Sequence, residues 1–202
     1  MRKFVLAVVA LLVSFGASAE LRWGPTASVN FNTFHWKEPL LETHMRTGFD
    51  AGIMTEIMIP GIGFGVDAGL TYGMRSAKVN FGQWEVWNSD GFGDENVTVH
   101  TVNIPLHLRF KYTRLEGLEE TIAPLVYAGP VFTFNAAGNC KALEQPFGTV
   151  SLDFGLGCEL FQKLQVSVGY LWGLSYTTRT LKLENLSARS DGFRVNLAYF
   201  FK

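Results

Sequence analysis

Residues 49–72 read FDAGIMTEIMIPGIGFGVDAGLTY, and this stretch decides the fold. On each side of Pro60-Gly61, apolar side chains occupy nearly every second position, and the positions between them hold mostly glycine, threonine or a carboxylate. Successive side chains of a β-strand point to opposite faces of the sheet. The stretch therefore predicts two strands that are joined by a tight turn and share one apolar face. Asp50, Glu56 and Asp67 fall on the other, polar face.

The same alternation predicts eight strands along the chain. It is clear in segments 147–161 and 192–201, where Asp153, Glu159 and Arg194 lie opposite the apolar face. Segment 122–134 is apolar on both faces, so the sequence does not assign its sides. The predicted strands are 21–31, 48–59, 62–74, 97–110, 122–134, 147–161, 164–176 and 192–201.

The connections between these strands are alternately short and long. Pro60-Gly61 and Gln162-Lys163 are tight turns. The long polar connections lie around Phe34–Arg46, Arg75–Asn96, Ala136–Gln145 and Thr177–Ser190. Transmembrane barrels have short periplasmic turns and long extracellular loops. A soluble sandwich has no reason to place all its long loops at one end.

Each predicted strand is long enough to cross the hydrocarbon layer, which takes about 9–11 tilted residues. An even number of strands closes without an edge, and closure matters because unpaired backbone groups are costly in lipid. We therefore predict an all-β fold, an eight-stranded antiparallel up-and-down transmembrane β-barrel with aromatic girdles at its rims. A soluble periplasmic binding barrel is the alternative.

The first residues have the pattern of a targeting signal. Two basic residues precede an apolar run over 4–15, and small residues suited to cleavage end at Ala19. The run is shorter than the about 20 residues that a transmembrane helix needs. We expect a cleaved signal peptide over 1–19, one barrel domain over 20–202, and a location in the outer membrane of a Gram-negative cell.

Pro105 and Pro130 lie inside predicted strands. Proline cannot donate a hydrogen bond to a strand ladder, and it is found at edges or bulges. A closed barrel has no edges, so we expect a β-bulge at each of these prolines.

The polar faces of the predicted strands carry both signs of charge. An eight-stranded barrel is just wide enough for side chains to fill it, and an unpaired buried charge is very costly. We expect a structural network of ion pairs that plugs the interior, and a pathway for protons or ions is the alternative. The predicted network consists of Asp50, Glu56, Asp67, His107, Arg109, Lys111, Asp153, Glu159 and Arg194.

The residue types that carry chemistry form no recognisable site in the sequence. His35 and His44 share the first long connection with Glu38 and Glu42, but their spacing matches no zinc pattern. A lipid-hydrolysing or acyl-transferring barrel would need a serine, a histidine base and an orienting group in contact. No local signature supports such a trio around His100. We expect no enzyme, no metal and no cofactor, and a lipid-modifying enzyme is the weakest alternative.

Cys140 and Cys158 are the only cysteines. A cysteine pair in an exported protein suggests a disulfide. Cys140 falls in a long connection, however, and Cys158 lies near the far end of the following strand. Because the Cα atoms of a disulfide lie within about 7 Å, we expect no bridge.

The long connections are the expected contact surface. Loop 75–96 carries Trp84, Trp87 and Phe92 among polar residues. Exposed aromatic residues can anchor a protein or a glycan, and folding back over the barrel mouth is the alternative. We expect contacts with outer-membrane lipid, and with an envelope or extracellular partner through loop 75–96, loop 32–47 or the periplasmic face. We expect a monomer that binds no nucleic acid, because no basic run could follow phosphates.

Short motifs resemble the PorT-like family of outer-membrane barrels, a group typical of the Bacteroidota. Residues 103–112 read NIPLHLRFKY and are followed by Ala128-Gly129-Pro130, similar to the IPLLLKY and GP core of that family. Gly48–Gly52, Leu70–Tyr72 and Val168–Tyr170 also fit its pattern. The resemblance implies a barrel with a secretion- or surface-associated role and supplies no catalytic residues. We predict a non-enzymatic structural or interaction protein of the envelope, with a narrow channel for ions or small solutes as the alternative.

Overall fold

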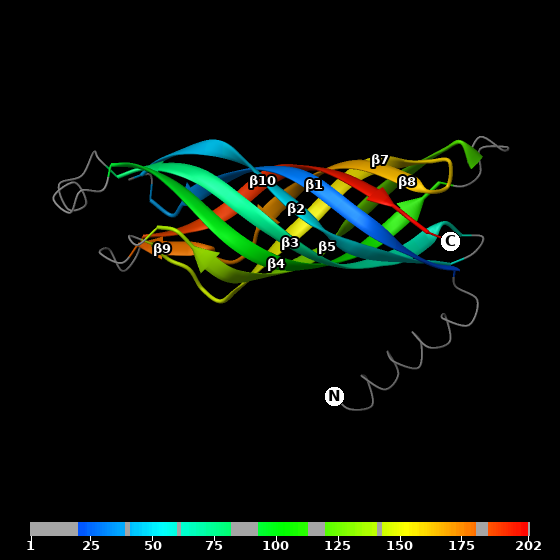
Figure 1. The fold of residues 1–202 in the computed structure, drawn as a ribbon, viewed down its shortest axis with the longest axis horizontal. Helices are drawn as coiled ribbons and strands as arrows, with labels where there is room; N and C mark the ends of the chain where they lie inside the picture. The colour runs from blue at the N-terminus through cyan, green and yellow to red at the C-terminus, as the bar shows by residue number, and fades with distance from the viewer. Residues whose placement is uncertain are drawn as a thin grey trace, which may run out of the picture.

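The computed structural model describes residues 20–38, 41–59, 62–81, 93–112, 120–140, 143–180 and 186–201. Eight long strands make up most of them, and these strands wind around a common axis (Figure 1). The long strands are β1 (Glu20–Trp36), β2 (Glu42–Met58), β3 (Phe64–Asn80), β4 (Asp94–Lys111), β5 (Ile122–Gly138), β7 (Gly148–Leu160), β8 (Leu164–Gly173) and β10 (Ser187–Tyr199). Two short strands accompany them, β6 (Leu143–Glu144) and β9 (Thr178–Thr180).

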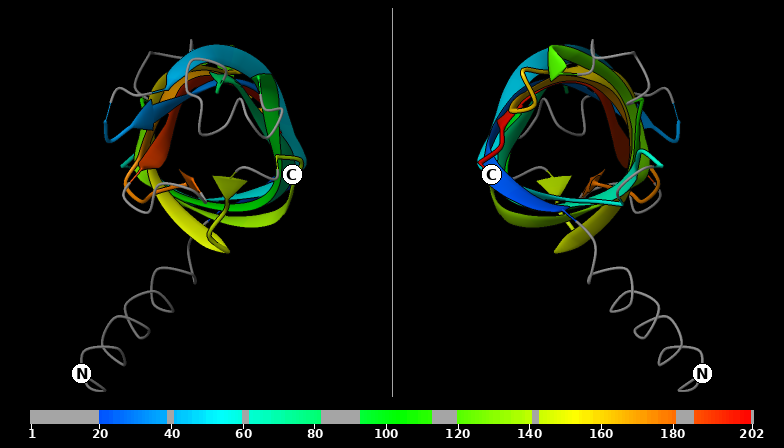
Figure 2. Two further views of the ribbon diagram at one scale, coloured as in Figure 1. Left: turned by 90° about the vertical axis from the view of Figure 1, so that its left-hand side faces the viewer. Right: turned by 90° about the vertical axis from the view of Figure 1, so that its right-hand side faces the viewer.

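The long strands form one closed antiparallel ring. Each pairs with the next along the chain, and β10 pairs with β1 from Ala198↔Thr26 to Ala188↔Trp36. The view along the axis shows the resulting cylinder (Figure 2). A closed ring leaves no row of unpaired backbone groups to face lipid. The prediction of an eight-stranded antiparallel barrel is therefore confirmed.

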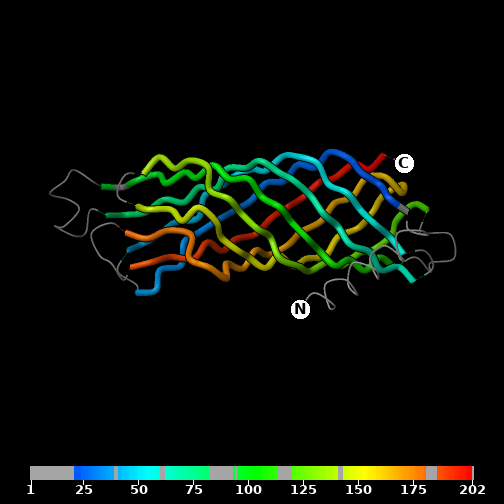
Figure 3. Tube along the Cα trace, turned by 90° about the horizontal axis from the view of Figure 1, so that it is seen from below, coloured from blue at the N-terminus to red at the C-terminus, as the bar shows by residue number. Residues whose placement is uncertain are grey.

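The two ends of the barrel differ in their connections, as the sequence predicts. The Cα trace shows the strands crossing the axis at an angle, with the C-terminus at one end (Figure 3). At that end, β7 and β8 are joined by a turn in which Phe161 and Gln162 have φ angles of 53° and 57°, as a type I′ hairpin turn requires. At the opposite end, β9 continues the wall by pairing with β10, and β6 pairs with β9. The predicted turn at Pro60-Gly61 lies outside the described residues.

Side chains alternate across the barrel wall. On β3, Val66 is exposed on the outside and Asp67 is buried on the inside. On β5, Leu125 and Tyr127 are buried and Val126 is exposed, so the structure assigns the two sides that the sequence left open. The outer face is apolar and the inner face is mostly polar, which is typical of a transmembrane barrel.

The outward apolar residues form a belt around the barrel. From Ile62 to Tyr72 its length matches the about 9–11 residues that cross the hydrocarbon layer. Aromatic contacts lie at both edges of the belt. Those edge contacts are Trp23–Phe201 at 5.3 Å between ring centroids and Tyr170–Phe193 at 5.1 Å.

The strands extend further than predicted at the end with the long connections. β1 reaches Trp36, β2 begins at Glu42 and β3 reaches Asn80. Much of Phe34–Arg46, and part of Arg75–Asn96, is therefore strand and not loop. The predicted limits were wrong because they followed the end of the apolar alternation. Backbone pairing does not depend on lipid, and it continues where water solvates the outward side chains.

The prediction of a β-bulge at Pro105 and at Pro130 was also wrong. Both prolines keep the register of their ladders. Between β4 and β5 the pairing is interrupted after Pro105 and resumes at Leu108 in the same register. The missing donor is accommodated by this local opening. The register shifts lie elsewhere, between Met45 and Phe49 and between His100 and Thr101.

No disulfide joins Cys140 and Cys158, as predicted. Cys158 pairs with Pro124 near the tight-turn end of the barrel. Cys140 packs against an apolar cluster at the opposite end. Among the described residues, none forms a helix long and apolar enough to cross a membrane.

Candidate functional site in the barrel lumen

The structure places all the residues of the predicted ion-pair network on the inner face of the barrel. Each of them is buried, and Arg194 is the most exposed at 8%. They lie on β2 (Asp50 and Glu56), β3 (Asp67), β4 (His107, Arg109 and Lys111), β7 (Asp153 and Glu159) and β10 (Arg194).

Two buried arginines that the sequence analysis missed, Arg22 and Arg75, also face the lumen. Arg22 shares the inner face of β1 with Ser28 and Asn30, so the alternation in segment 21–31 could have found it. Arg75 lies just beyond the predicted end of its strand, and the sequence therefore assigned it to a loop.

A first layer of ion pairs lies near the tight-turn end. Arg22 Nη2 contacts Glu159 Oε2 at 2.8 Å, and the same guanidinium pairs with Glu56. Lys111 Nζ lies 2.8 Å from Glu159 and 3.1 Å from Glu56. Gln165 donates to Glu159 at 2.8 Å. Because β7 neighbours neither β1 nor β4, the contacts of Arg22 and Lys111 with Glu159 cross the lumen.

A second layer lies in the middle of the lumen. Arg194 Nη1 contacts Asp153 Oδ2 at 3.0 Å, and Arg194 Nη2 lies 3.4 Å from Asp50 Oδ2. His107 Nε2 is 3.4 Å from Asp153 Oδ2. Arg109 contacts Glu56 of the first layer at 3.0 Å and Asp67 at 2.5 Å.

Arg75 lies one step further toward the end with the long connections. Its Nη2 donates to Thr133 Oγ1 at 3.0 Å and to Asn103 Oδ1 at 3.4 Å. Asn103 in turn donates to Asp50 at 2.9 Å. Neutral side chains thus connect this arginine to the ionic layers.

The buried charges that face the lumen balance in the part of the chain that the structure describes. The basic side chains are Arg22, Arg75, Arg109, Lys111 and Arg194, and the carboxylates are Asp50, Glu56, Asp67, Asp153 and Glu159. Unpaired ionic groups would carry a large desolvation penalty. The balance is what a structural plug requires.

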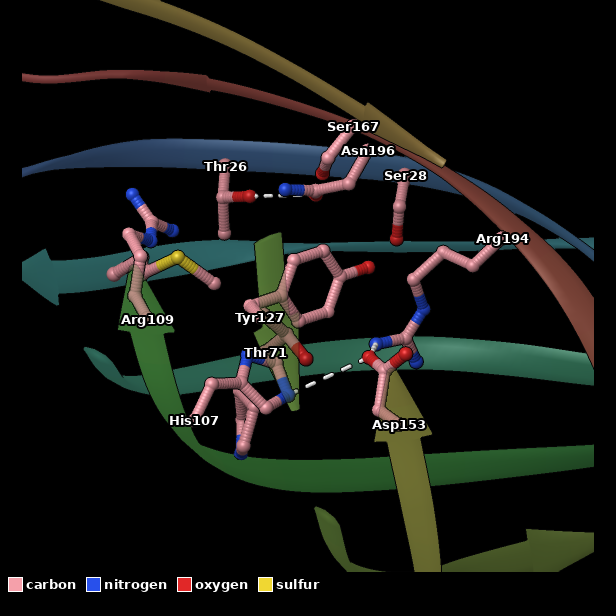
Figure 4. A pocket seen from close by; sticks show the side chains of 12 residues that line it. Thr26, Ser28, Thr71, His107, Arg109, Tyr127, Asp153, Ser167, Arg194 and Asn196 are labelled. Carbon is pink, nitrogen blue, oxygen red and sulfur yellow. Dashed lines mark hydrogen bonds and ion pairs between the residues drawn. The ribbon is translucent and has the colours of Figure 1, made fainter. Parts of the chain in front are cut away.

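A small cavity remains beside the second ionic layer. It has a volume of about 20 Å³ and is bordered by His107, Asp153 and Arg194 of that layer and by Arg109 (Figure 4). Tyr127 projects into the same space, with its ring 4.9 Å from the ring of His107. A cavity of this size holds about one water molecule. It is too small for a solute.

An apolar cluster fills the lumen at the end with the long connections. Phe34, Val79 and Val99 contribute to it from β1, β3 and β4, and Leu143 of β6 packs against them. Phe81 and Val79 are fully buried. Interiors of this kind are close-packed. Ion pairs therefore fill the lumen near the tight-turn end and in the middle. The apolar cluster fills it at the end with the long connections.

The described residues bring no catalytic trio together. Ser76 bonds to Thr98 at 3.2 Å, while His100 Nδ1 lies 2.9 Å from the hydroxyl of Tyr72. Ser89, the other serine near His100 in sequence, lies outside the described residues. Within the described ranges no three histidine, cysteine, aspartate or glutamate side chains are grouped as metal ligands.

Comparison with known proteins supports the architecture. The model of the family described as "Outer membrane protein beta-barrel domain" matches residues 4–201. Among curated proteins, none matches the chain.

Several solved barrels resemble the structure over most of its length. The outer membrane protein OprG from Pseudomonas aeruginosa has a TM-score of 0.54 at 11% identity, covering 90% of this chain and 94% of OprG. Neisserial surface protein A has a TM-score of 0.48 at 9% identity, covering 90% and 99%. Ail, the attachment invasion locus protein of Yersinia pestis, has a TM-score of 0.41 at 10% identity, covering 90% and 99%. At these identities the likeness to OprG shows the fold alone.

Proposed function

Because the chain belongs to the outer membrane protein beta-barrel domain family, we propose that it is a non-conducting, non-enzymatic barrel that holds an interaction surface at the cell surface. The protein is an outer-membrane β-barrel. Long loops of such barrels face outward and short turns face the periplasm. The extracellular end is therefore the end that carries β6 and β9.

The filled lumen is the observation that supports a non-conducting role. Contacts from Arg22 and Lys111 to Glu159 cross the interior. The apolar cluster around Phe34 occupies the extracellular part. A channel would need a continuous wet path, whereas the cavity beside the second ionic layer has room for about one water.

The interaction surface is proposed to lie on the extracellular connections, with loop 75–96 foremost. Its described parts, 75–81 and 93–96, belong mostly to β3 and β4. These strand ends extend past the belt. Trp84, Trp87 and Phe92 lie outside the described residues. Most of the second candidate, 32–47, belongs to β1 and β2, so it would act as rigid strand ends. The partner is an envelope or extracellular protein or a glycan, and the barrel acts as a monomer.

The narrower family assignment is also a proposal. The motif over 103–112 occupies the part of β4 that crosses the belt, and Ala128-Gly129-Pro130 lies beside it on β5. This juxtaposition supports a PorT-like barrel with a secretion- or surface-associated role. A cleaved signal peptide over 1–19 is the proposed export signal.

Bilayer conductance tests the plugged lumen. Purified protein is inserted into planar bilayers beside a variant that removes both members of a cross-lumen pair, Arg22→Ala/Glu159→Ala. We expect no stable unitary steps from the unaltered protein. Large steps whose size changes in the double variant would show that ions pass through this lumen, and would overturn the proposal.

Loop replacement tests the interaction surface. Residues 82–92 are replaced by a short Gly-Ser linker, and the matched control replaces 113–119 at the periplasmic end. We expect the first variant to assemble and to lose partners in a pull-down from crosslinked cells, while the control retains them. An unchanged set of partners in the first variant would contradict the proposal.

A further inference from the structure

The outward side chains of β1 and β10 change from apolar to polar and then to basic beyond the belt. Residues that pair across this antiparallel ladder share one face of the wall. From the belt toward the extracellular end, the outward pairs are Phe31↔Phe193, Thr33↔Asp191 and His35↔Arg189. Phe193 is 52% exposed and is the last apolar residue of β10 on this face. The edge of the belt therefore lies just beyond it.

Two more basic side chains lie two residues beyond His35 and Arg189, toward the extracellular end. The backbone N–H of Lys37 donates to the carbonyl of Ser187 at 2.9 Å. Ser187 also pairs with Arg179 of β9. Lys37 and Arg179 are both exposed, while Thr178 and Thr180 beside Arg179 are buried. Lys37, Arg179 and Arg189, which we call the rim cations, thus lie with His35 on successive steps of one outward surface.

The rim cations lie just beyond the layer of lipid headgroups, within reach of it. Four residues separate Phe193 from Arg189, which is about 13 Å along a strand and about 10 Å along the membrane normal at the tilt of about 40° usual in such barrels. The headgroup layer extends about 5–8 Å beyond the hydrocarbon on each side. Long basic side chains bend back toward that layer. Their charged ends can therefore reach the phosphates of the outer leaflet.

The guanidinium of Arg189 stacks on an aromatic ring. Its guanidinium carbon lies 5.2 Å from the centre of the Tyr176 ring. Stacking of this kind stabilises the cation and leaves the planar edge of the guanidinium free to bind two oxygens of one phosphate.

Two carboxylates share this surface without cancelling its charge. Asp191 accepts the backbone N–H of Gly173 at 2.7 Å and lies 3.7 Å from His35 Nε2. Glu144 pairs with Arg179 across β6 and β9. The three rim cations still outnumber these two carboxylates.

We propose that the rim cations bind the phosphate groups of an anionic lipid of the outer leaflet. The occupant is a membrane lipid and not a soluble anion, because the surface continues directly from the apolar belt. Acyl chains would lie along Phe31 and Phe193 while the phosphate meets Arg189. The proposal concerns the outer wall and does not depend on the plugged lumen or on a loop partner.

Lipid retention in nanodiscs tests this site. The protein is reconstituted in phosphatidylcholine with a small fraction of diphosphorylated lipid A, and the retained lipid A is counted by native mass spectrometry. The variant Arg179→Gln/Arg189→Gln should retain about fivefold less for each cation removed. The control is Lys163→Gln, an exposed cation on the periplasmic turn between β7 and β8, and it should retain as much as the unaltered protein.

Two further arms use the unaltered protein and so do not depend on the folding of a variant. Dephosphorylated lipid A should be retained no better than phosphatidylcholine. Inorganic phosphate at the concentration of the lipid should not displace diphosphorylated lipid A. Equal retention of the dephosphorylated lipid, full displacement by inorganic phosphate, or unchanged retention by the double variant would each overturn the proposal.

Discussion

Arg22 connects strands that lie far apart in the sequence. Its guanidinium contacts Glu56 on β2 and Glu159 on β7, and it donates to the carbonyl of Gln162 at 2.7 Å. Glu56 and Glu159 are both buried, and Arg22 and Lys111 form ion pairs with both of them. A single residue near the start of the barrel thus stabilises the end of another hairpin.

At the residue scale, we predict that Arg22→Met is strongly destabilising. Removing one partner of a buried ionic group leaves the other uncompensated, so the free energy of unfolding should fall by about 3–5 kcal/mol. Urea unfolding in detergent micelles measures it. The exposed control Lys163→Met should change this free energy by less than about 0.5 kcal/mol. Equal effects for both variants would show that the contacts of Arg22 contribute nothing to stability.

The belt can be probed along a single strand. Val66 lies outward near the middle of the belt on β3, and Met74 lies past its edge at Tyr72. The cost of placing a charge on a lipid-facing position depends on its depth.

We predict that Val66→Arg lowers the free energy of unfolding in bilayers by about 2–4 kcal/mol, and that Met74→Arg lowers it by about 0–1 kcal/mol. Unfolding from lipid vesicles, followed by tryptophan fluorescence, gives both values. The two substitutions introduce the same side chain on the same strand. If Met74→Arg were the costlier, the belt would be misplaced.

The apolar cluster at the extracellular end is a second feature at the element scale. Phe34 is 5% exposed inside it, whereas Phe147 is 77% exposed outside. Phe34→Ala should lower the free energy of unfolding by about 3–5 kcal/mol through the cavity it leaves. Phe147→Ala should stay within about 0.5 kcal/mol, apart from its contact with Phe134. Limited proteolysis from the extracellular side should cut Phe34→Ala faster. A Phe34→Ala variant as stable as Phe147→Ala would mean that the cluster is loosely packed.

At the scale of the whole molecule, stability depends on the seam between β1 and β10. This ladder joins the two ends of the chain, and the isolated bridge Trp23↔Phe201 extends it. Without it, β1 and β10 would each present an unpaired edge to lipid.

We predict that deletion of residues 187–201 abolishes the difference in gel migration between unboiled and boiled protein, because no closed barrel forms. Deletion of 82–92 removes a similar length of chain without touching the seam, and should preserve that difference. A heat-modifiable band from the first deletion would show that the remaining strands close by themselves.

Much of the fold could be predicted from particular residues. The alternation around Asp50, Glu56 and Asp67 identified the inner face, and the turn at Gln162-Lys163 identified the tight-turn end. The limits of the strands could not be predicted in this way, because polar outward residues such as Thr33 and His35 read as loop although their backbone is paired. The prolines misled for a related reason, since Pro105 interrupts a ladder without shifting its register.

The sequence by itself determined that the chain alternates between lipid and water, and therefore that it closes into a barrel, because period-two polarity is a local property of each strand. Only the tertiary structure decided which charges meet. Contacts such as that of Arg22 with Glu159 cross the lumen between strands that are not neighbours. They depend on the stagger of the strands, which brings residues from distant strands to the same level along the barrel axis. The same stagger gathers Phe34, Val79 and Leu143 into an apolar cluster, and this packing around a closed ring is what fills the interior.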